Sequence, residues 1–517
     1  MNESDNVDHI TSTSKISGSL TRRSFIKTTA VLSSTLMLEA AGSSLVGGNA
    51  YGSEWAPVAY PKVLLYNFGL FDGEKNQIQK RLVLLVEGDT ILSIEPEGEL
   101  AQYEGFKLVD LDGRTILPGL IDNHVHMTVP FMYNVNMATI RQMNGQIALN
   151  FKACVNSGVT TVRDVGGFPA KINKFRAMAD TGEIPGPRVI SSLSPIAARR
   201  GDALGAPEVA PYFTNPVIKW FLGGNYAERP TNVDEIEEAC ERMIKLGAQW
   251  LKTLHQDHAM SYNGKELPNH SDEGYRTILR IGREHGIKCA LHEPLLSGFK
   301  KGVDLGYHTL EHMPVDAVIP DEYIERFAQQ EMAMMPTVIV VGGDDFIGDE
   351  LLGLVETRGK EFLMPEAVNQ VSTMLKDSLA RDRKAKQDGT STTDRQYGRD
   401  MFPNLMENLR KLHSMGATVG MGTDLGGTYC AFFGRYADEL KHFATAGISN
   451  VDILRAATSV NARIIDMHNK IGKLEKGKLA DIIAVRGNPL EDIRAMGNVD
   501  LVMKGGTFMK AEGVDLA

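Results

Sequence analysis

Strand-like runs alternate with helical runs through the middle of this chain, and this alternation restricts the fold more than any other feature. The helical runs include residues 235–246, 273–285 and 321–330. The strand-like runs are residues 119–126, 159–164, 188–192, 249–254, 288–292, 308–312, 334–341 and 418–424. Strands that alternate with helices favour a parallel sheet, and eight such repeats predict an α/β fold of the (β/α)8 TIM-type barrel.

Two segments that flank this alternation have a β pattern instead. Residues 63–66, 82–87, 91–94 and 108–111 precede it, and residues 479–485 and 499–504 follow it. Glycine-containing turns separate these runs, as in a small antiparallel domain. We expect residues 51–115 and 470–517 to pair in one small β-sandwich domain, with the barrel over residues 116–469. The polar, helical stretch at 342–414 is predicted to be an insertion over the barrel mouth.

The first fifty residues have the features of an export signal. Arg22 and Arg23 are followed by Phe25, and a weakly apolar run covers residues 30–38. The pattern resembles a twin-arginine signal, and the apolar run is too short to span a bilayer. We therefore expect residues 1–50 to be a signal and polar leader that directs the protein to the periplasm or the exterior, with no integral membrane span.

The charge and the cysteine content of the chain limit the classes of partner and of metal site that it can have. The chain of 517 residues carries 55 Lys and Arg against 65 Asp and Glu, a net charge of −10, and the two signs are interspersed. Because no basic face is apparent, we expect a small-molecule substrate and no nucleic-acid partner. The four cysteines are far apart and form no CxxC pair, so neither a disulfide scaffold nor a zinc ribbon is expected. Any metal ion would be held mainly by histidine and carboxylate.

Candidate metal ligands occur where the predicted strands end. His124 and His126 are two residues apart at the end of the first strand, so both imidazoles can point to one side. His292, His312 and Asp424 end three further strands. Since a barrel of this type places its active site at the carboxyl ends of its strands, these residues predict a metal centre there.

Lys252 lies in the fourth predicted strand among apolar neighbours. Burial of its amine would lower the pKa, and a neutral amine can react with carbon dioxide to give a carbamate that could bridge two cations. His255, His258 and Glu293 are candidates for contact with substrate. For the two histidines, a loop position without a catalytic role is the alternative.

Several motifs resemble the metal-dependent amidohydrolase superfamily. They are residues 115–126 (TILPGLIDNHVH), 158–167 (GVTTVRDVGG), the pair Glu311 and His312, and residues 422–424 (GTD). Residues 471–481 and 487–490 resemble the C-terminal signature of that superfamily. The chain is most similar to the imidazolonepropionase-like branch, which includes Xaa-Pro dipeptidases and carboxypeptidases that hydrolyse N-acyl amino acids.

The resemblance implies two divalent metal ions, expected to be zinc. It assigns the more buried ion to His124, His126 and Asp424, and the second ion to His292 and His312. Carboxylated Lys252 would bridge both.

The chain departs from the family pattern at two places. Many relatives carry a second histidine after the fifth-strand ligand, where this chain has Glu293 and Pro294. Relatives often show Gly-Gly-His after the third strand, where this chain has residues 199–202 (RRGD). These differences indicate that the substrate pocket differs from those of the relatives, whereas the metal site is intact.

The resulting prediction is hydrolysis of an amide or peptide-like C–N bond. A hydroxide that bridges the metals would attack, and Asp424 would carry the proton to the departing amine. One alternative is a deaminase of a cyclic or heteroaromatic substrate, against which Lys252 weighs because such relatives usually keep one metal and lack this lysine. The other is a catalytically inactive binding homologue. Barrels of this class often form homo-oligomers, and no sequence feature fixes the number of subunits.

Overall fold

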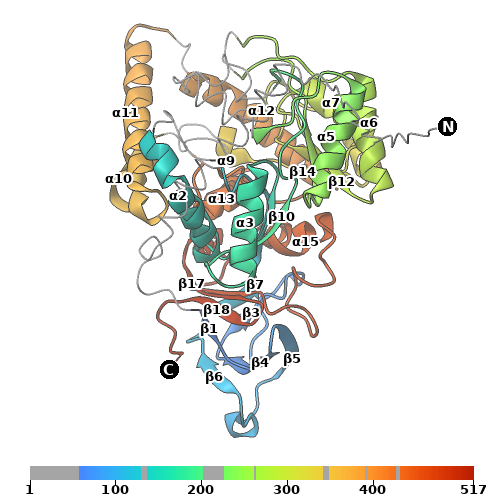
Figure 1. Cartoon of the computed structure of the whole chain (residues 1–517). Helices are drawn as coiled ribbons and strands as arrows, with labels where there is room; N and C mark the ends of the chain where they lie inside the picture. The colour runs from blue at the N-terminus through green and yellow to red at the C-terminus, as the bar shows by residue number, and fades with distance from the viewer. Residues whose placement is uncertain are drawn as a thin grey trace, which may run out of the picture. The chain divides into compact units, whose positions relative to one another are not determined.

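The computed structural model describes residues 57–129, 137–201, 226–260, 264–341, 348–390, 394–426 and 431–516 (Figure 1). The predicted signal and leader at residues 1–50 lie outside the described residues, as do Asp202 and Cys430. Within the described ranges, no helix combines the length and apolarity needed to cross a membrane.

Eight parallel strands form two sheets in the middle of the chain. The three-stranded sheet has the order β10-β9-β8, and the five-stranded sheet has the order β11-β12-β13-β14-β15. Their bounds are β8 (Leu120–Val125), β9 (Val159–Asp164), β10 (Arg188–Ser191), β11 (Trp250–Leu254), β12 (Lys288–His292), β13 (Thr309–Glu311), β14 (Ala333–Met335) and β15 (Thr418–Val419). The α/β fold predicted from the alternation is confirmed.

Backbone hydrogen bonds join the two parallel sheets at both of their edges. On one side, Gln249 N donates to Ser191 O at 2.8 Å and Ile196 N donates to Lys252 O at 2.8 Å. On the other side, Asp424 N donates to His124 O at 2.7 Å. These bonds bring the carboxyl ends of β8, β11 and the segment after β15 to one region.

Helices connect the strands and pack against them (Figure 1). Helix α5 begins after Asn232, whose side chain accepts a hydrogen bond from Glu235 N, and α6 begins after Ser271, which caps Gly274 N in the same way. The helices of this region are α2 (Met137–Asn156), α3 (Pro169–Asp180), α5 (Val233–Lys245), α6 (Asp272–Glu284), α7 (Leu296–Leu305), α8 (Asp321–Gln329), α13 (Tyr436–Thr445), α14 (Asn450–Arg455) and α15 (Asn461–Ile464).

The two terminal segments pair with each other, as expected from their β pattern. Figure 1 draws the blue strands of the first segment beside the red strands of the last. The six-stranded sheet has the order β1 (Val58–Ala59), β18 (Thr507–Ala511), β17 (Val499–Lys504), β16 (Ile482–Val485), β7 (Thr115–Pro118) and β3 (Gly69–Leu70). The four-stranded sheet has the order β5 (Thr90–Pro96), β4 (Leu82–Glu87), β2 (Lys62–Tyr66) and β6 (Lys107–Asp110). One apolar cluster contains residues of both sheets, among them Leu65, Leu84, Ile482 and Phe508.

The predicted strand at 334–341 is wrong over its second half. β14 ends at Met335, and helix α9 (Val338–Val341) follows Thr337, whose φ is +48°. The buried carboxylate of Glu439 accepts hydrogen bonds from Val338 N at 2.9 Å and Ile339 N at 2.8 Å. These bonds satisfy the first amides of a helix, which is why an apolar, β-branched run is helical here.

The stretch at 342–414 is helical where it is described, as predicted. It contains α10 (Asp349–Arg358), α11 (Pro365–Gln387) and α12 (Asp394–Ser414), while residues 342–347 and 391–393 lie outside the described residues. Asn408 in α12 donates to Pro314 O at 2.8 Å and Ala317 O at 2.9 Å, and it accepts from Ile319 N at 2.8 Å. Helix α12 therefore holds the loop that follows His312.

Gly119, between β7 and β8, provides a test of packing in this fold. A Cβ atom there would lie 2.2 Å from Oγ1 and 2.9 Å from Cβ of the buried Thr160. We expect Gly119→Ala to lower the free energy of unfolding by about 1–3 kcal/mol, as measured by denaturant titration. Thr160→Ala in the same chain should restore part of this loss.

The matched control is Gly353→Ala in α10, where an added Cβ meets nothing within 4 Å. Alanine is the better helix former, so this variant should be as stable as the wild type or more stable. Equal stability of Gly119→Ala and Gly353→Ala would contradict the close contact with Thr160.

Candidate metal centre

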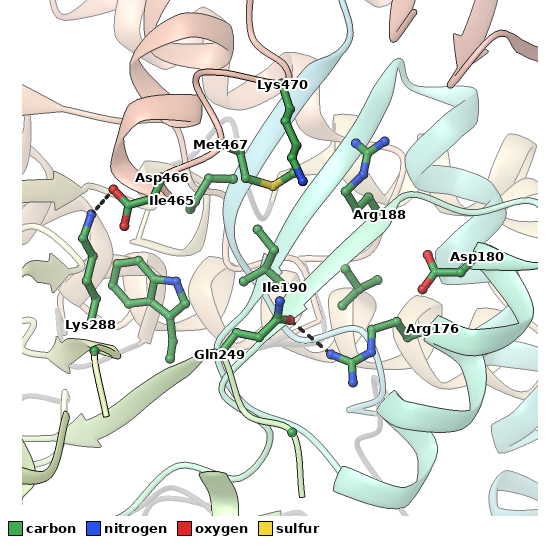
Figure 2. Close-up of a pocket in the computed structure, with 14 residues that line it drawn as sticks. Arg176, Asp180, Arg188, Ile190, Gln249, Lys288, Ile465, Asp466, Met467 and Lys470 are labelled. Carbon is green, nitrogen blue, oxygen red and sulfur yellow. Dashed lines mark hydrogen bonds and ion pairs between the residues drawn. The ribbon is translucent and has the colours of Figure 1, made fainter. Parts of the chain in front are cut away.

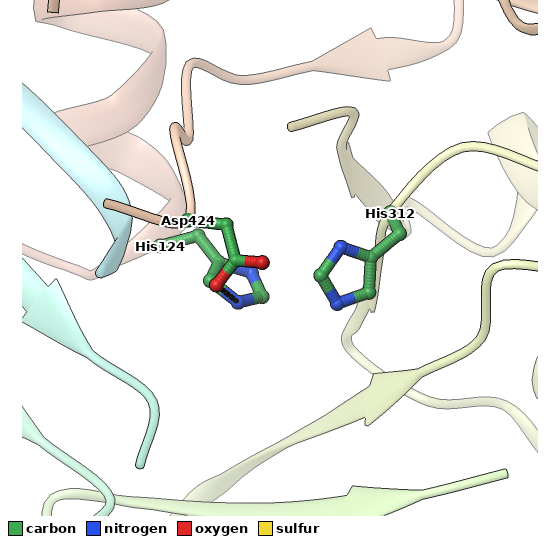
Figure 3. A group of neighbouring side chains, drawn as sticks. All are labelled: His124, His312 and Asp424. Carbon is green, nitrogen blue, oxygen red and sulfur yellow. Dashed lines mark ion pairs between the residues drawn. The ribbon is translucent and has the colours of Figure 1, made fainter. Parts of the chain in front are cut away.

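The predicted ligands gather at the carboxyl ends of the parallel strands. His124 lies near the end of β8, Lys252 lies in β11, and His292 ends β12. His312 follows β13 directly, and Asp424 follows β15 by a short segment. Figure 3 shows His124, His312 and Asp424 facing one another from three different segments. Among the described residues, ligand atoms of these three lie within 4.8 Å of one another, which makes them a candidate metal site.

His126 and His292 adjoin this group. His126 Nε2 lies 2.9 Å from Asp424 Oδ1, and His124 Nε2 lies 3.4 Å from the same oxygen. The rings of His292 and His312 have centroids 4.4 Å apart, and those of His124 and His312 are 4.8 Å apart. The structure therefore brings together all five predicted imidazole and carboxylate ligands, while their division between two ions stays a prediction.

Backbone geometry at two of these residues is uncommon. His312 has φ +77° and Asp424 has φ +57°, in the left-handed region that few residues other than glycine adopt. His312 N donates to Met335 O at 2.8 Å, and Asp424 N donates to His124 O at 2.7 Å. Both ligands are thus held by bonds to neighbouring strands.

Asp122 fixes the segment that carries Asp424. Its carboxylate accepts hydrogen bonds from Thr423 N at 3.1 Å and Thr423 Oγ1 at 2.6 Å. Burial raises the pKa of Asp122 to about 7. Next to this contact, the Asn461 amide donates to Ile121 O and Met421 O, each at 2.7 Å, and so joins β8 to the segment after β15.

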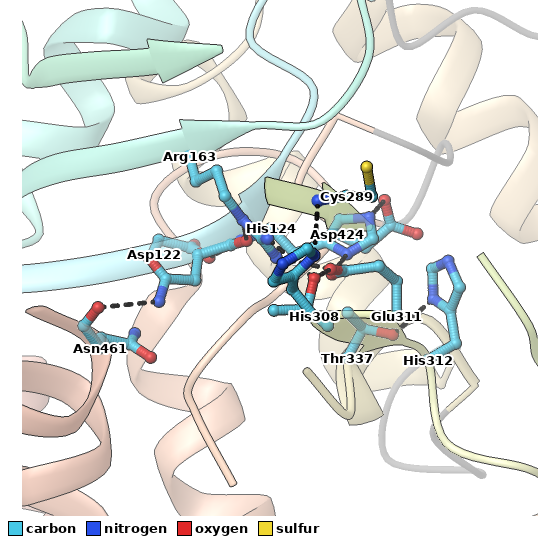
Figure 4. A network of polar contacts seen from close by, with 12 residues as sticks. Asp122, His124, Arg163, Cys289, His308, Glu311, His312, Thr337, Asp424 and Asn461 are labelled. Atoms are coloured by element: carbon cyan, nitrogen blue, oxygen red, sulfur yellow. Dashed lines mark hydrogen bonds and ion pairs between the residues drawn. The ribbon is translucent and has the colours of Figure 1, made fainter. Parts of the chain in front are cut away.

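A buried chain of polar contacts orients His124 (Figure 4). Its Nδ1 donates to Glu311 Oε2 at 2.7 Å, and Glu311 Oε1 accepts from Arg163 Nη2 at 2.6 Å. Arg163 also donates to Asn123 O at 2.6 Å and to Thr309 Oγ1 at 3.0 Å, and its guanidinium lies 4.4 Å from the Trp250 ring centroid. Since Glu311 accepts at Nδ1, it is Nε2 of His124 that lies on the side of Asp424 and is available to a metal ion.

Sequence reasoning missed the roles of Arg163 and Glu311. Both side chains have no exposed surface. The available signal was the occurrence of charged residues within otherwise apolar strands, since such charges are rarely buried unless they are paired.

Burial leaves the imidazoles of His292 and His312 free to bind a cation. Burial holds the pKa of His292 well below its usual value, and the positive charge of Lys252 acts in the same direction. Burial has the same effect on the pKa of His312. Both are neutral near pH 7. His126 Nδ1 donates to Gly166 O at 2.7 Å. Burial would lower the pKa of His126, but the contact of its Nε2 with Asp424 outweighs burial and raises the pKa above its usual value. His292 Nε2 lies 3.0 Å from Gln256 Oε1, a neighbour that the sequence did not suggest.

Lys252 is buried, as predicted, with 3% of its surface exposed. Burial lowers its pKa to about 8. Its Nζ is a buried atom with no hydrogen-bond partner among the described residues. For Asp424, burial would raise the pKa, but the nearby His124 and His126 outweigh it and hold the pKa well below its usual value. An ionised carboxylate, the neutral imidazoles of His292 and His312 and a buried amine without a partner fit a divalent cation.

The three candidates for substrate contact differ in their surroundings. His255 is buried, and its Nδ1 lies 3.0 Å from the Tyr275 hydroxyl. His258 is exposed on the following loop. Glu293 has no exposed surface, and neither of its carboxylate oxygens has a hydrogen-bond partner. Burial raises the pKa of Glu293 well above its usual value.

The chain is similar to known proteins in sequence and in fold. Ochratoxinase from Aspergillus niger is 25% identical over 417 residues, which cover 77% of this chain and 76% of that protein. Its crystal structure superposes with a TM-score of 0.65 over 88% of this chain and 97% of that one, at 20% identity. A Xaa-Pro dipeptidase with bound methionine gives a TM-score of 0.64 at 23% identity and covers 86% of this chain and 99% of that one.

The model of the amidohydrolase family matches residues 115–342 and 344–509. The match includes both sheets of parallel strands and every predicted metal ligand. Members of this family generally use divalent metals. The chain therefore belongs to the amidohydrolase family and is an enzyme that hydrolyses carbon–nitrogen bonds.

Proposed function

We propose that this enzyme hydrolyses an amide or dipeptide-like bond with two divalent ions, zinc in the native protein. The observation that carries the proposal is the convergence of buried His124, His312 and Asp424, whose ligand atoms lie within 4.8 Å of one another at the carboxyl ends of the strands. The buried Nζ of Lys252, which has no hydrogen-bond partner among the described residues, belongs to the same region. An ochratoxinase and a Xaa-Pro dipeptidase among the similar proteins favour this substrate class.

In this proposal His124, His126 and Asp424 would hold one ion, and His292 and His312 would hold the other. Lys252, whose pKa of about 8 makes a neutral amine accessible, would add carbon dioxide and release a proton to give a carbamate that supplies two further oxygen ligands. When bound, the ions supply Lewis acidity, which lowers the pKa of a water molecule and polarises the scissile carbonyl.

Asp424 is the proton carrier of the proposed reaction. Its carboxylate is ionised, because the nearby imidazoles hold its pKa low. It can therefore accept the proton that the attacking water loses. Its position on a left-handed turn after β15, between β8 and the loop after β13, allows it to pass that proton to the departing amine.

The proposal also covers how the sheets are arranged in domains. We propose that the parallel strands close into a TIM-type barrel over residues 116–469 and that residues 51–115 and 470–517 form one β-sandwich domain. The hydrogen bonds at both sheet junctions and the apolar cluster shared by the terminal sheets support this division. Helices α10 to α12 would cover the mouth of the site.

We also propose export by the twin-arginine route to the periplasm or exterior. The pair Arg22 and Arg23 with Phe25 supports this route. Proteins exported in this way fold first, which suits an enzyme that takes up its metal in the cytoplasm.

The function is tested by a substrate screen with the purified, metal-loaded enzyme. We expect turnover of N-acyl amino acids or dipeptides, and about two metal ions per chain by elemental analysis. Asp424→Asn keeps a similar shape and should lower kcat by about 10²–10⁴-fold, the contribution typical of general acid–base groups. Release of ammonia from a heteroaromatic ring by an enzyme with one ion would instead favour the deaminase. Absence of both metal and turnover would favour the inactive homologue.

Lys252→Ala tests the bridging carbamate. Without the lysine, we expect loss of bound metal and of activity, with partial recovery of both on addition of acetate or propionate, because a free carboxylate can replace the carbamate. Metal content by elemental analysis and initial rates measure the two effects.

Lys171→Ala is the matched control for Lys252→Ala. Burial also lowers the pKa of Lys171, but its ammonium donates to Asn144 Oδ1 at 2.6 Å. This variant should keep its metal. An unchanged metal content in Lys252→Ala would contradict the carbamate.

Glu311→Gln tests the orientation of His124. The amide can no longer both accept from His124 Nδ1 and neutralise Arg163, so we expect metal affinity or kcat to fall by about 10–100-fold. Competition with a chelator measures the affinity. The control is Glu241→Gln, which changes an exposed carboxylate that lies 2.8 Å from His285 Nε2. Equal metal affinity in the wild type and Glu311→Gln would show that the buried contact does not act on the metal site.

A further inference from the structure

A second cavity opens at the opposite ends of the parallel strands. It has a volume of about 800 Å³. Its walls include Arg188, Trp250 and Lys288, which are the first residues of β10, β11 and β12. Because the metal ligands lie at the carboxyl ends of the strands and this cavity lies at the amino ends, the two sites are separate. Figure 2 shows the side chains that line it.

Two of the cations in the walls are already paired with carboxylates. Lys288 Nζ lies 2.7 Å from Asp466 Oδ1, and Arg188 Nη1 lies 2.8 Å from Asp481 Oδ2. These pairs leave little charge to attract a ligand. They hold the two side chains in place at the edge of the cavity.

Two further cations in the walls have no carboxylate partner in the part of the chain that the structure describes. The guanidinium of Arg176 is bonded to Gln249 Oε1 at 3.1 Å and Asn173 Oδ1 at 2.8 Å, and both acceptors are neutral amides. Lys470 is exposed, and its ammonium has no polar partner among the described residues. Asp180 also lines the cavity. With Asp481 included, four cations face three carboxylates, so the walls carry excess positive charge.

Part of the wall is apolar and rigid. Ile190, Ile465 and Met467 line the cavity next to Trp250. The Trp250 ring is held by the guanidinium of Arg163, 4.4 Å from its centroid. Trp250 is 3% exposed and Ile190 is 6% exposed, so the half-buried Met467 offers the apolar contact to a ligand.

From these contacts we propose that the cavity binds a small organic anion with one phosphate or carboxylate group and an apolar ring. The planar fork of Arg176, fixed by two amides, matches such a group, and Lys470 adds a second charge. The ring of the ligand lies against Met467, beside the edges of the buried Trp250 and Ile190. This site does not depend on the proposed hydrolysis.

Binding of phenyl phosphate to the full-length, metal-loaded protein tests the proposal, with isothermal titration calorimetry as the measurement. We expect Arg176→Gln with Lys470→Gln to weaken one binding event by about tenfold or more, since two charge-assisted contacts are lost. The control is Lys174→Gln with Lys476→Gln, which removes the same charge from exposed positions outside the cavity and should leave the affinity unchanged. Because the metal centre is unchanged in both variants, any binding of phenyl phosphate to the metal centre contributes equally to both measurements.

Trp250 offers an independent signal. Tryptophan fluorescence should change on addition of phenyl phosphate in the wild type and not in Trp250→Phe. Inorganic phosphate should bind more weakly than phenyl phosphate, because it lacks the ring.

Equal affinity of the cavity variant and its control would overturn the site, as would the absence of binding to the wild type. Equal affinity for the two probes would overturn the apolar contact. If the double variant is less stable than the wild type, the affinity of Lys470→Gln for phenyl phosphate is measured instead, because the side chain of Lys470 is exposed and its loss should not affect folding. Its affinity should fall severalfold, and an unchanged value would count against the proposal.

Discussion

The buried contact between Arg163 and Glu311 is the interaction on which the rest of this site depends. It links β9 to β13, reaches β8 through His124 and Asn123, and reaches β11 through Trp250. A buried ion pair is costly unless its remaining donors and acceptors are satisfied, and here the partners satisfy them. Removing one member would leave an uncompensated charge, at a cost of about 3–5 kcal/mol. The same contact that joins four strands also sets the tautomer of a metal ligand.

The sequence allowed the ligands to be predicted because their pattern is local. His124, His126, His292 and Asp424 each lie at or just beyond the end of a recognisable strand. Strand ends meet at one face of a parallel sheet. The buried lysine followed from its apolar neighbours. The features that could not be predicted depend on hydrogen bonds between residues that are distant in sequence. Glu439 accepts from the first amides of the helix at residues 338–341, and Asn461 joins β8 to the segment after β15.

Trp250 links the metal centre with the cavity at the other end of the parallel strands. Its ring contacts the guanidinium of Arg163, which orients His124 through Glu311, and Trp250 also lines the cavity at the amino ends of the strands. In a parallel sheet the residues between the two ends are usually packing residues alone. Here a single aromatic ring at the first position of β11 contacts the polar chain that leads to the metal ligands, so the two ends share one rigid element.

The left-handed backbone at His312 and Asp424 has an evolutionary consequence. A side chain with a Cβ atom costs about 1–2 kcal/mol in this conformation, and glycine adopts it with no such cost. Selection for stability alone would favour glycine at both positions, whereas selection for metal binding favours histidine and aspartate. If a descendant no longer needed its substrate, replacement of these metal-binding residues by glycine would increase its stability. Loss of catalysis would therefore be favoured, and its reversal would cost stability.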